Sequence, residues 1–508
     1  MNYLTLALLF IIGLLVIRML VLEGITIIRL IKFRLKGLKQ VEYFFWPYTF
    51  IKDLIVPREE RVDECQVVKK KMFEADQKEP FTVEAESGKL WFFLRSHEAI
   101  SEFYKKEIGN TIKQNYFVKL KFLSFFYQNG KEVHEGRSTF AKIFHYSNVV
   151  SLMPQIHQSI KNHVNALRKR VAAAKDQRLK INMKEEFLLQ LFEDLTGCIL
   201  LTGADKKIRA TFDGMSISQV LKKMFDCFED HPEQIVAWLP FCEELGLSKP
   251  AREFKRLQNG LRKIISDQYK ARYNTASEED LADNSILDIM VKLNKKSERE
   301  NGKPQFSLEE ISDNFEMFQF AGSDTSFQAS CSFMTFLAQP ENHKYQEKVY
   351  SEIKTEEDIN EEKLSSLKEL NMCFRETMRM ANPAPMIVPR QVVKDFKLCG
   401  YQLKKGDMAF QFLLQYQSAF FKDPFKWAPE RFSEEARKNL PYTMQIPFSH
   451  GQRGCIGKYL GEIMVKLIVS EMVKNFKFEV EEGYVMKLAM KPIYGVSNPE
   501  LILSLRKE

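Results

Sequence analysis

The chain has 508 residues, 45% of them hydrophobic and 28% charged, with a formal net charge of +8. This composition is typical of a globular protein with a large core. Six basic residues and one acidic residue lie within the first 40, so most of the surplus charge is local and nothing indicates a nucleic-acid-binding face. The eight cysteines show no paired spacing, which argues against a disulfide framework and favours a reducing compartment.

The N-terminal segment is apolar over residues 4–22, with Arg18 as its one charged residue. Its length is close to the roughly 20 residues that cross a bilayer core. Basic residues follow the segment and none precede it, which predicts a membrane anchor over residues 1–31 with its C-terminal side in the cytoplasm. A cleaved signal peptide is the alternative, but it requires a basic start and a small-residue cleavage site, and neither is evident.

Residues 32–57 are basic and then aromatic, with prolines at 47 and 57, and we expect them to form a hinge before a folded domain over residues 58–508. Alternating apolar residues on either side of Glu86-Ser87-Gly88 predict a hairpin. From 151 to 300, apolar residues recur at spacings of three and four, which predicts helices throughout this region.

A long helix is expected from Ser307 to residue 338. Ser307 and Glu310 fit a capping box, and no proline follows until Pro340. The glycine and polar residues of 321–326 weaken the interior of this helix, which is expected where function requires it. Thr325 is placed to bond the carbonyl of Ala321, four residues back, and to loosen the helix beside Gly322. Packing of a serine and threonine cluster against a neighbouring element is the alternative.

Two later segments carry charged motifs. Glu376 and Arg379 are three residues apart, so they share a helical face and can pair, although exposed pairs of this kind are common. Arg431 follows within Trp427-Ala-Pro-Glu-Arg-Phe432. Hairpins are expected over residues 400–406 and between residues 494–496 and 501–505.

The segment from Phe448 to Gly457 holds three glycines, an arginine and a cysteine before a helix that begins near Lys458. Glycines let the backbone approach a flat partner closely. Cys455 at the helix N-terminus is biased toward the thiolate, which is a metal ligand; an inert buried thiol is the alternative.

The order of these motifs resembles the cytochrome P450 family of heme-thiolate monooxygenases. The heme-binding signature of the family is matched at its five fixed positions, which are Phe448, Gly451, Arg453, Cys455 and Gly457. The segment 321–326 is similar to the oxygen-activation motif, and Glu376 with Arg379 is similar to the Glu-x-x-Arg motif. Val133 stands where the family has a tryptophan that contacts a heme propionate.

The resemblance implies a mainly α fold with small β-sheets (α+β), built as a triangular helical prism around a buried heme, with the N-terminal transmembrane helix added. It implies heme b as the cofactor, with Cys455 as the axial ligand of the iron and the remaining signature residues around it. It implies Asp324 and Thr325 as catalytic residues, Arg137 and Arg390 as contacts of the heme propionates, and Glu376, Arg379 and Arg431 as a structural charge network.

The function implied by the resemblance is insertion of one oxygen atom from O2 into a lipophilic substrate, such as a fatty acid, a sterol or a xenobiotic. The expected electron donors are NADPH-cytochrome P450 reductase and cytochrome b5, at the endoplasmic reticulum membrane with the catalytic domain in the cytoplasm. Two alternatives stay open, a heme-thiolate isomerase or peroxygenase that needs no reductase and a non-catalytic heme sensor. The pair Asp324 and Thr325 argues against both.

Overall fold

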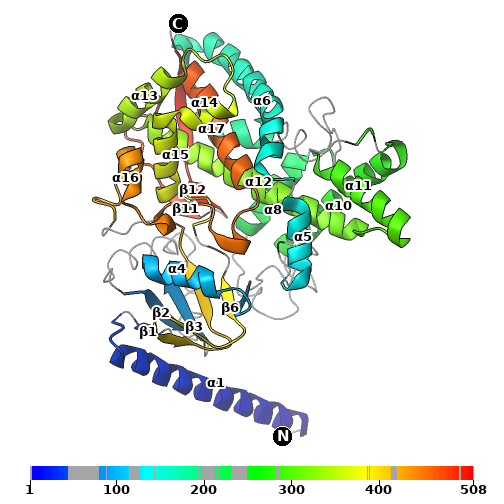
Figure 1. Ribbon diagram of the computed structural model, residues 1–508, viewed down its shortest axis with the longest axis vertical. Coiled ribbons are helices and arrows are strands. Elements are labelled where there is room, and N and C mark those ends of the chain that lie inside the picture. Colours follow the sequence, from blue (N-terminus) through cyan, green and yellow to red (C-terminus); the bar gives the residue numbers. More distant parts are fainter. Residues whose placement is uncertain are drawn as a thin grey trace. The chain divides into compact units, whose positions relative to one another are not determined.

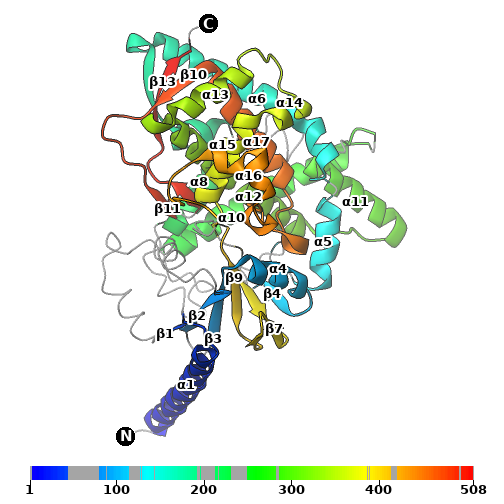
Figure 2. The ribbon, with the colours of Figure 1, turned by 60° about the vertical axis from the view of Figure 1, so that its left-hand side comes forward.

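The computed structural model describes most of the chain as two compact units. The described residues are 3–39, 41–43, 79–86, 89–113, 126, 129–141, 143–191, 195, 212–215, 217–229, 249–277, 279–281, 285–385, 387, 389–413, 420–490 and 493–506. Unit 1 comprises Met1–Gln114, Pro385–Phe425 and Leu440–Gln452, and unit 2 comprises Asn115–Ala384, Lys426–Asn439 and Arg453–Glu508. Figures 1 and 2 show the ribbon from two directions.

Unit 1 is built on a six-stranded sheet with the order β1-β2-β3-β9-β6-β4. The strands are β1 (Val41–Tyr43), β2 (Phe81–Glu86), β3 (Lys89–Leu94), β4 (Thr111–Lys113), β6 (Arg390–Val392) and β9 (Met408–Gln411). The expected hairpin around residues 86–88 is confirmed, because β2 and β3 pair antiparallel with Phe81 opposite Leu94. The alternation that predicted it is also seen in burial, since Leu90, Phe92 and Leu94 of β3 are buried and the residues between them are partly exposed.

Unit 1 also contains α4 (His97–Lys106), the strands β7 (Phe396–Leu398) and β8 (Tyr401–Leu403), and the short helix η8 (Tyr442–Met444). Ser96 caps α4 by accepting a hydrogen bond from the backbone N–H of Ala99. The hairpin expected over residues 400–406 is formed by β7 and β8, and its turn lies earlier than predicted. Cys399 and Gly400 form this turn with positive φ angles of 47° and 78°.

The N-terminal helix α1 (Tyr3–Leu35) packs against the sheet of unit 1 through its C-terminal half. The buried ring of Phe33 contacts the rings of Phe92 and Tyr401, with ring centroids 5.9 Å and 5.7 Å apart. The guanidinium of Arg29 donates two hydrogen bonds, of 2.8 Å and 2.6 Å, to the buried carboxylate of Asp407. Helix α1 therefore contacts the rest of unit 1 already at Arg29, which lies within the expected anchor and before the hinge expected at residues 32–57.

The expected transmembrane helix over residues 1–31 is not supported by the structure. Among the described residues, none of the helices combines the length and the apolar composition that crossing a membrane requires. The side chains of residues 1–9, which belong to the expected anchor, lie outside the described part of the chain, as do residues 44–57 of the expected hinge.

Unit 2 is mainly helical. Its helical segments are α5 (Lys131–Ala141), α6 (Tyr146–Ala173), η3 (Lys175–Gln177), η4 (Lys184–Leu191), α8 (Ile217–Glu229), α10 (Lys249–Thr275), α11 (Ile286–Asn301), α12 (Leu308–Ala338), η6 (Pro340–Asn342), α13 (His343–Ile353), α14 (Glu361–Ser366), α15 (Lys368–Met380), η7 (Pro429–Phe432), α16 (Glu434–Lys438) and α17 (Lys458–Asn475). The short helix η9 (Gly451–Arg453) lies where the chain passes from unit 1 to unit 2. The prediction of a mainly helical chain with small sheets is confirmed.

Unit 2 also carries two small sheets, which correct two predictions. Strands β10 (Phe476–Glu479), β13 (Glu500–Leu505) and β5 (Arg178–Asn182) form one sheet in that order, and β11 (Leu488–Met490) pairs with β12 (Tyr494–Val496) in the other. The expected pairing of 494–496 with 501–505 is wrong, because each segment pairs with a different strand. The region 151–300 is not helical throughout, because β5 pairs with β13 from the far end of the chain.

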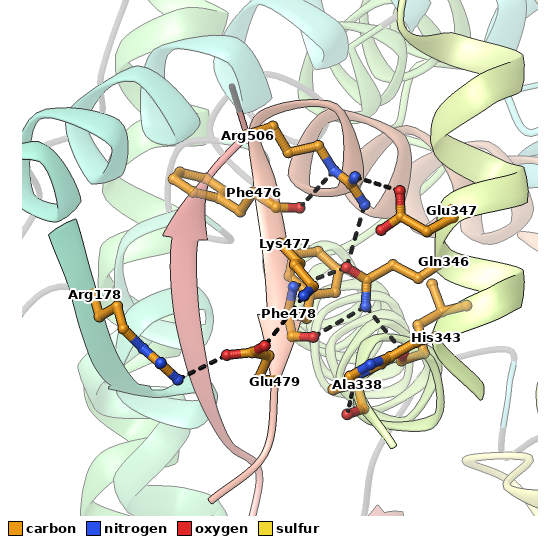
Figure 3. A network of polar contacts seen from close by, with 11 residues as sticks. Arg178, Ala338, His343, Gln346, Glu347, Phe476, Lys477, Phe478, Glu479 and Arg506 are labelled. Atoms are coloured by element: carbon orange, nitrogen blue, oxygen red, sulfur yellow. Dashed lines mark hydrogen bonds and ion pairs between the residues drawn. The ribbon is translucent and has the colours of Figure 1, made fainter. Parts of the chain in front are cut away.

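The outer strand β10 is held by side chains as well as by its neighbour β13, as Figure 3 shows. The amide of Gln346 on α13 donates to the carbonyl of Phe478 at 3.1 Å and accepts from its N–H at 2.8 Å. Arg506 donates to the carbonyl of Phe476 at 3.3 Å and to the carboxylate of Glu347 at 2.8 Å. These contacts occupy backbone groups that an edge strand otherwise leaves open to other chains.

Candidate functional site

Cys455 lies in the short stretch between η9 and α17, and its side chain is exposed. Gly457 is the N-cap of α17, so the thiol lies close to the positive end of this helix. A thiolate is favoured beside a helix N-terminus and a cation. A thiol can bind the metal ion of a cofactor only if the cofactor can reach it, and the exposed side chain of Cys455 meets this requirement. The same exposure contradicts the alternative of a buried thiol.

Arg137 on α5 supports the loop that carries Cys455. Its Nη2 donates a hydrogen bond of 2.5 Å to the carbonyl of Gly454. Burial lowers the pKa of the Arg137 guanidinium, and a negative charge at Cys455 opposes this shift. Arg453, on the other side of Gly454, donates to the Oδ1 of Asn129 at 3.3 Å. Arg137 is therefore close to the thiol, and its predicted contact with a propionate stays a prediction.

Helix α12 forms as the sequence predicts. Ser307 and Glu310 make both hydrogen bonds of the capping box, and the helix continues for 31 residues. Nearly every residue from 311 to 338 is buried. The side chains that break this pattern are Phe318, Phe320, Ala321, Gly322 and Thr325, which we call the α12 window.

The α12 window is open at Gly322. A Cβ added to this glycine would meet no atom within 4 Å among the described residues. Thr325 Oγ1 donates a hydrogen bond of 2.6 Å to the carbonyl of Ala321, which confirms the bond expected from the sequence. Asp324 is buried beside this threonine. The helix thus presents an open backbone surface with a hydroxyl at its edge.

These features of unit 2 fit a flat cofactor that carries a metal ion. Cys455 supplies an exposed thiol as a ligand, and the glycines at 454 and 457 on either side of it have no side chains. The α12 window offers a surface on which a planar group can lie without meeting a Cβ at Gly322. The roles of Asp324, Thr325, Arg453, Cys455 and Gly457 in such a site stay predictions.

The predicted charge network of Glu376, Arg379 and Arg431 is present in the structure. Arg379 donates two hydrogen bonds to Glu376, of 2.7 Å and 2.8 Å, and both residues are buried. Arg431 lies 3.4 Å from the same carboxylate. The backbone N–H of Ala428 also donates to Glu376, at 2.8 Å. One carboxylate therefore joins α15 to η7, and the alternative of an exposed surface pair is excluded.

Trp427 adds a second link between the same segments. Its indole N–H donates to Thr377 Oγ1 at 3.3 Å, and its ring stacks on Phe336 of α12 with the ring centroids 5.5 Å apart. Tyr345 of α13 lies edge-on to the same indole at 5.3 Å and donates to the carboxylate of Glu430. The network therefore connects the segment 426–432 to helices α12, α13 and α15 within unit 2.

Three predicted cofactor contacts belong to unit 1. Phe448 is partly buried, and Gly451 has a φ of +72°, which favours glycine at that position. Arg390 of β6 pairs with Glu107, with Arg390 Nε and Glu107 Oε2 3.2 Å apart and both residues buried. The predicted contact of Arg390 with a heme propionate stays a prediction.

Several residues that support these positions carry no signal in the local sequence. Glu107 lies 283 residues before Arg390, and no local pattern marks it as a partner. Tyr104 donates to the amide oxygen of Gln411, and its hydroxyl lies 2.8 Å from Ser449 Oγ within the cysteine motif. Burial raises the pKa of Tyr104 to about 12, so its hydroxyl stays a donor. The side chains of Val133 and its neighbour at 134 lie outside the described residues.

The family model described as Cytochrome P450 matches residues 65–505 of this chain. Among curated relatives, cytochrome P450 71B12 of Arabidopsis thaliana is 30% identical over 234 residues, which is 44% of this chain and 46% of the relative. Cytochrome P450 26B1 of Mus musculus is 25% identical over 382 residues, which is 71% of this chain and 67% of the relative. The match therefore spans about half the length of the plant relative.

A solved structure described as retinoic acid bound cyanobacterial CYP120A1 superposes on this chain with a TM-score of 0.68. The two sequences are 18% identical, and the superposition covers 84% of this chain and 92% of the other. This likeness shows that the two chains share a fold.

Proposed function

Because the chain belongs to the cytochrome P450 family, we propose that it is a heme-thiolate monooxygenase that inserts one oxygen atom from O2 into a lipophilic substrate. The observation that carries the proposal is the exposed thiol of Cys455 in a glycine-flanked loop before α17. The experiment is a difference spectrum of the reduced protein with and without carbon monoxide. A Soret band at the position typical of thiolate ligation is expected, and a band elsewhere would reject the ligand.

The residues of unit 2 that would hold heme b are Cys455, whose thiolate would bind the iron, and Gly457, Arg453 and Arg137 around its loop. The predicted roles of Phe448, Gly451 and Arg390, which belong to unit 1, rest on the resemblance to the family alone. A heme iron ligated by a thiolate supplies the activation of dioxygen, because the thiolate pushes electron density toward O–O cleavage. Backbone N–H groups near Cys455 moderate this push where they bond to its sulfur.

The α12 window supplies the protons that oxygen activation consumes. Thr325 Oγ1 donates a hydrogen bond to the carbonyl of Ala321, and its lone pairs remain available to accept a hydrogen bond from a proton donor. Asp324 is buried one residue before it and is the proposed source of that proton. Gly322 leaves the space beside the hydroxyl open for a small molecule. These residues orient and protonate, and the cofactor carries the redox chemistry.

Replacing Thr325 with alanine is expected to uncouple NADPH consumption from product formation. The substitution removes the hydroxyl that delivers the proton, so product formation should fall by about 100-fold or more, as on loss of a general acid. NADPH oxidation should continue and release hydrogen peroxide. The measurement is the ratio of product to NADPH consumed.

Two variants control this test. Thr325→Ser keeps a hydroxyl and should restore coupling, whereas Ser323→Ala removes a neighbouring hydroxyl from a different face of α12 and should leave coupling unchanged. Unchanged coupling in Thr325→Ala would remove the proton relay from the proposal.

The proposed electron donor is NADPH-cytochrome P450 reductase, with cytochrome b5 as a second donor, since the reaction needs two electrons for each oxygen atom inserted. Turnover by the purified chain should require the reductase and NADPH. Full turnover with hydrogen peroxide alone would instead favour the peroxygenase alternative.

We place the protein at the cytoplasmic face of the endoplasmic reticulum membrane, held by the first part of α1. The support is the exposure of large apolar side chains on this helix, such as Phe10 at 68% and Ile17 at 60%.

Deleting residues 1–22 leaves the contacts of Arg29 and Phe33 with unit 1 in place. This variant should lose its alkali-resistant association with membranes and remain folded. Retention in the membrane fraction would show that another segment binds the membrane.

The substrate class rests on the apolar character of the α12 window, in which Phe318 and Phe320 are partly exposed beside Ala321 and Gly322. Apolar and aromatic linings favour lipophilic ligands. Fatty acids, sterols and xenobiotics all meet this description. A screen of these three classes by Soret shift on the purified protein distinguishes them, because only a molecule that reaches the cofactor pocket changes the spectrum.

A further inference from the structure

Helices α10 and α12 of unit 2 pack against each other through buried polar side chains. Figures 1 and 2 show the two helices next to each other. Four residues meet at this contact, Gln258 and Arg262 from α10 and Asp313 and Glu316 from α12. Gln319 lies three positions after Glu316 and so on the same side of α12. We call these five residues the Glu316 cluster. All but Arg262 are at most 5% exposed. Polar residues of this kind are seldom buried without a specific partner.

The register between the two helices brings these residues together. Ser266 Oγ and Ser312 Oγ are 3.3 Å apart at one end of the contact. One turn earlier on α10, Arg262 Nη2 lies 2.6 Å from Asp313 Oδ1. Another turn earlier, Gln258 is close enough to Glu316 for its amide to affect the carboxyl group. As the chain is followed back from Ser266 to Gln258 on α10, the partner on α12 advances from Ser312 to Glu316, so the two helices run antiparallel at this contact.

Several polar atoms of the Glu316 cluster have no hydrogen-bond partner among the described residues. They include Oε2 of Glu316, Oε1 and Nε2 of Gln319, Nε2 of Gln258 and Nε of Arg262. A buried polar atom that lacks a protein partner is normally satisfied by an ordered water, which bonds several such groups at once. The grouping of donors and acceptors from two helices meets this requirement.

We propose that the Glu316 cluster is an internal water-binding site that works as a proton-coupled latch. A proton on Glu316, together with the bound water, holds α10 against α12, and loss of this proton lets α10 move away from α12. The latch does not depend on the proposed function. On a helix with 100° per residue, Glu316 lies on the face of α12 opposite Thr325, nine positions away.

The charges around Glu316 explain why the proton is retained. Burial raises the pKa of Glu316 to about 8, and the charge of Asp313 adds to this shift, while Arg262 and the amide of Gln258 oppose it. Arg262 is already paired with Asp313, so it is shared between two carboxyl groups. Glu186 of η4, which also packs against α12, is held by Arg170 of α6 at 2.6 Å.

The sign of the pH dependence follows from this raised pKa. When α10 separates from α12, Glu316 meets water and its pKa returns toward the usual 4.5. Between these two values the closed state holds a proton that the open state releases, so opening becomes more favourable as the pH rises. Below about pH 4.5 both states are protonated, and above about pH 8 both are ionised, so the pH dependence is confined to this window.

Hydrogen exchange of the full-length protein, followed by mass spectrometry between pH 5.5 and 8, tests the latch. After correction for intrinsic exchange, opening of residues 249–275 should rise by about tenfold per pH unit in the wild type. Glu316→Gln keeps the shape and cannot lose a proton, so its opening should not change with pH. Glu309→Gln removes an exposed carboxylate from the same helix and should behave as the wild type.

Equal opening of residues 249–275 at all pH values in the wild type would overturn the latch, as would the same pH dependence in Glu316→Gln. Infrared spectroscopy of the wild type gives an answer that does not depend on the folding of a variant. The carbonyl stretch of a protonated carboxylic acid should be present at pH 6 and disappear as the pH rises through 8. Its absence at pH 6 would overturn the proposal.

Discussion

Replacing Cys455 with serine is expected to abolish the thiolate Soret band and to reduce product formation by at least about a thousandfold, as on removal of an essential group. Serine has almost the same size as cysteine, so the loop before α17 should keep its structure. Its hydroxyl does not ionise at neutral pH and does not supply an anionic sulfur to the iron. The measurements are the reduced carbon monoxide difference spectrum and the rate of product formation.

Cys399→Ser is the matched control. Cys399 is half-buried in the turn between β7 and β8 of unit 1, and burial raises the pKa of its thiol to about 12. This substitution should leave both the spectrum and the rate unchanged. A thiolate spectrum that survives Cys455→Ser would mean that another cysteine binds the iron, and the proposed site would then be wrong.

The features of the fold that could be predicted from the sequence are those that depend on residues close together in the chain. The capping box of Ser307 and Glu310 and the hairpin of β2 and β3 depend on residues a few positions apart, and both are present. Strand β5 was missed because its partner β13 lies about 320 residues later, with Leu179 opposite Leu503. The docking of α1 was missed for the same reason, since 378 residues separate Arg29 from Asp407.

In the candidate site, too, contacts between residues close in the sequence were predictable and contacts between distant residues were not. Thr325 and Ala321 are four residues apart on one helix, so their hydrogen bond was predictable from spacing. The link from Arg137 to the carbonyl of Gly454 joins residues 317 apart, and only the tertiary structure reveals it. Burial of polar groups on α12 was also invisible in the sequence, because the Glu316 cluster depends on how α10 packs against it.

The second large effect concerns the buried carboxylate of Glu376. This carboxylate accepts hydrogen bonds from Arg379 and from the backbone N–H of Ala428, and it lies 3.4 Å from the guanidinium of Arg431. Its removal therefore leaves two cations without their counter-charge. Breaking a buried ion pair by removing one partner costs about 3–5 kcal/mol, because the remaining charge is uncompensated. The structure therefore predicts that Glu376 is more important for stability than for the reaction itself.

Glu376→Gln is accordingly expected to lower the free energy of unfolding by about 3–5 kcal/mol, measured by urea denaturation, and to reduce the heme retained per chain. Glu435→Gln, which removes an exposed carboxylate from nearby α16, should change neither quantity. Replacing Glu376 and Arg379 together by leucine and methionine should recover part of the loss, since apolar side chains of similar volume often replace a buried pair without cost. If the double variant is no more stable than Glu376→Gln, the unpaired Arg379 is not the main cause of the loss, and Arg431, which both variants leave without its carboxylate, would then be the main cause.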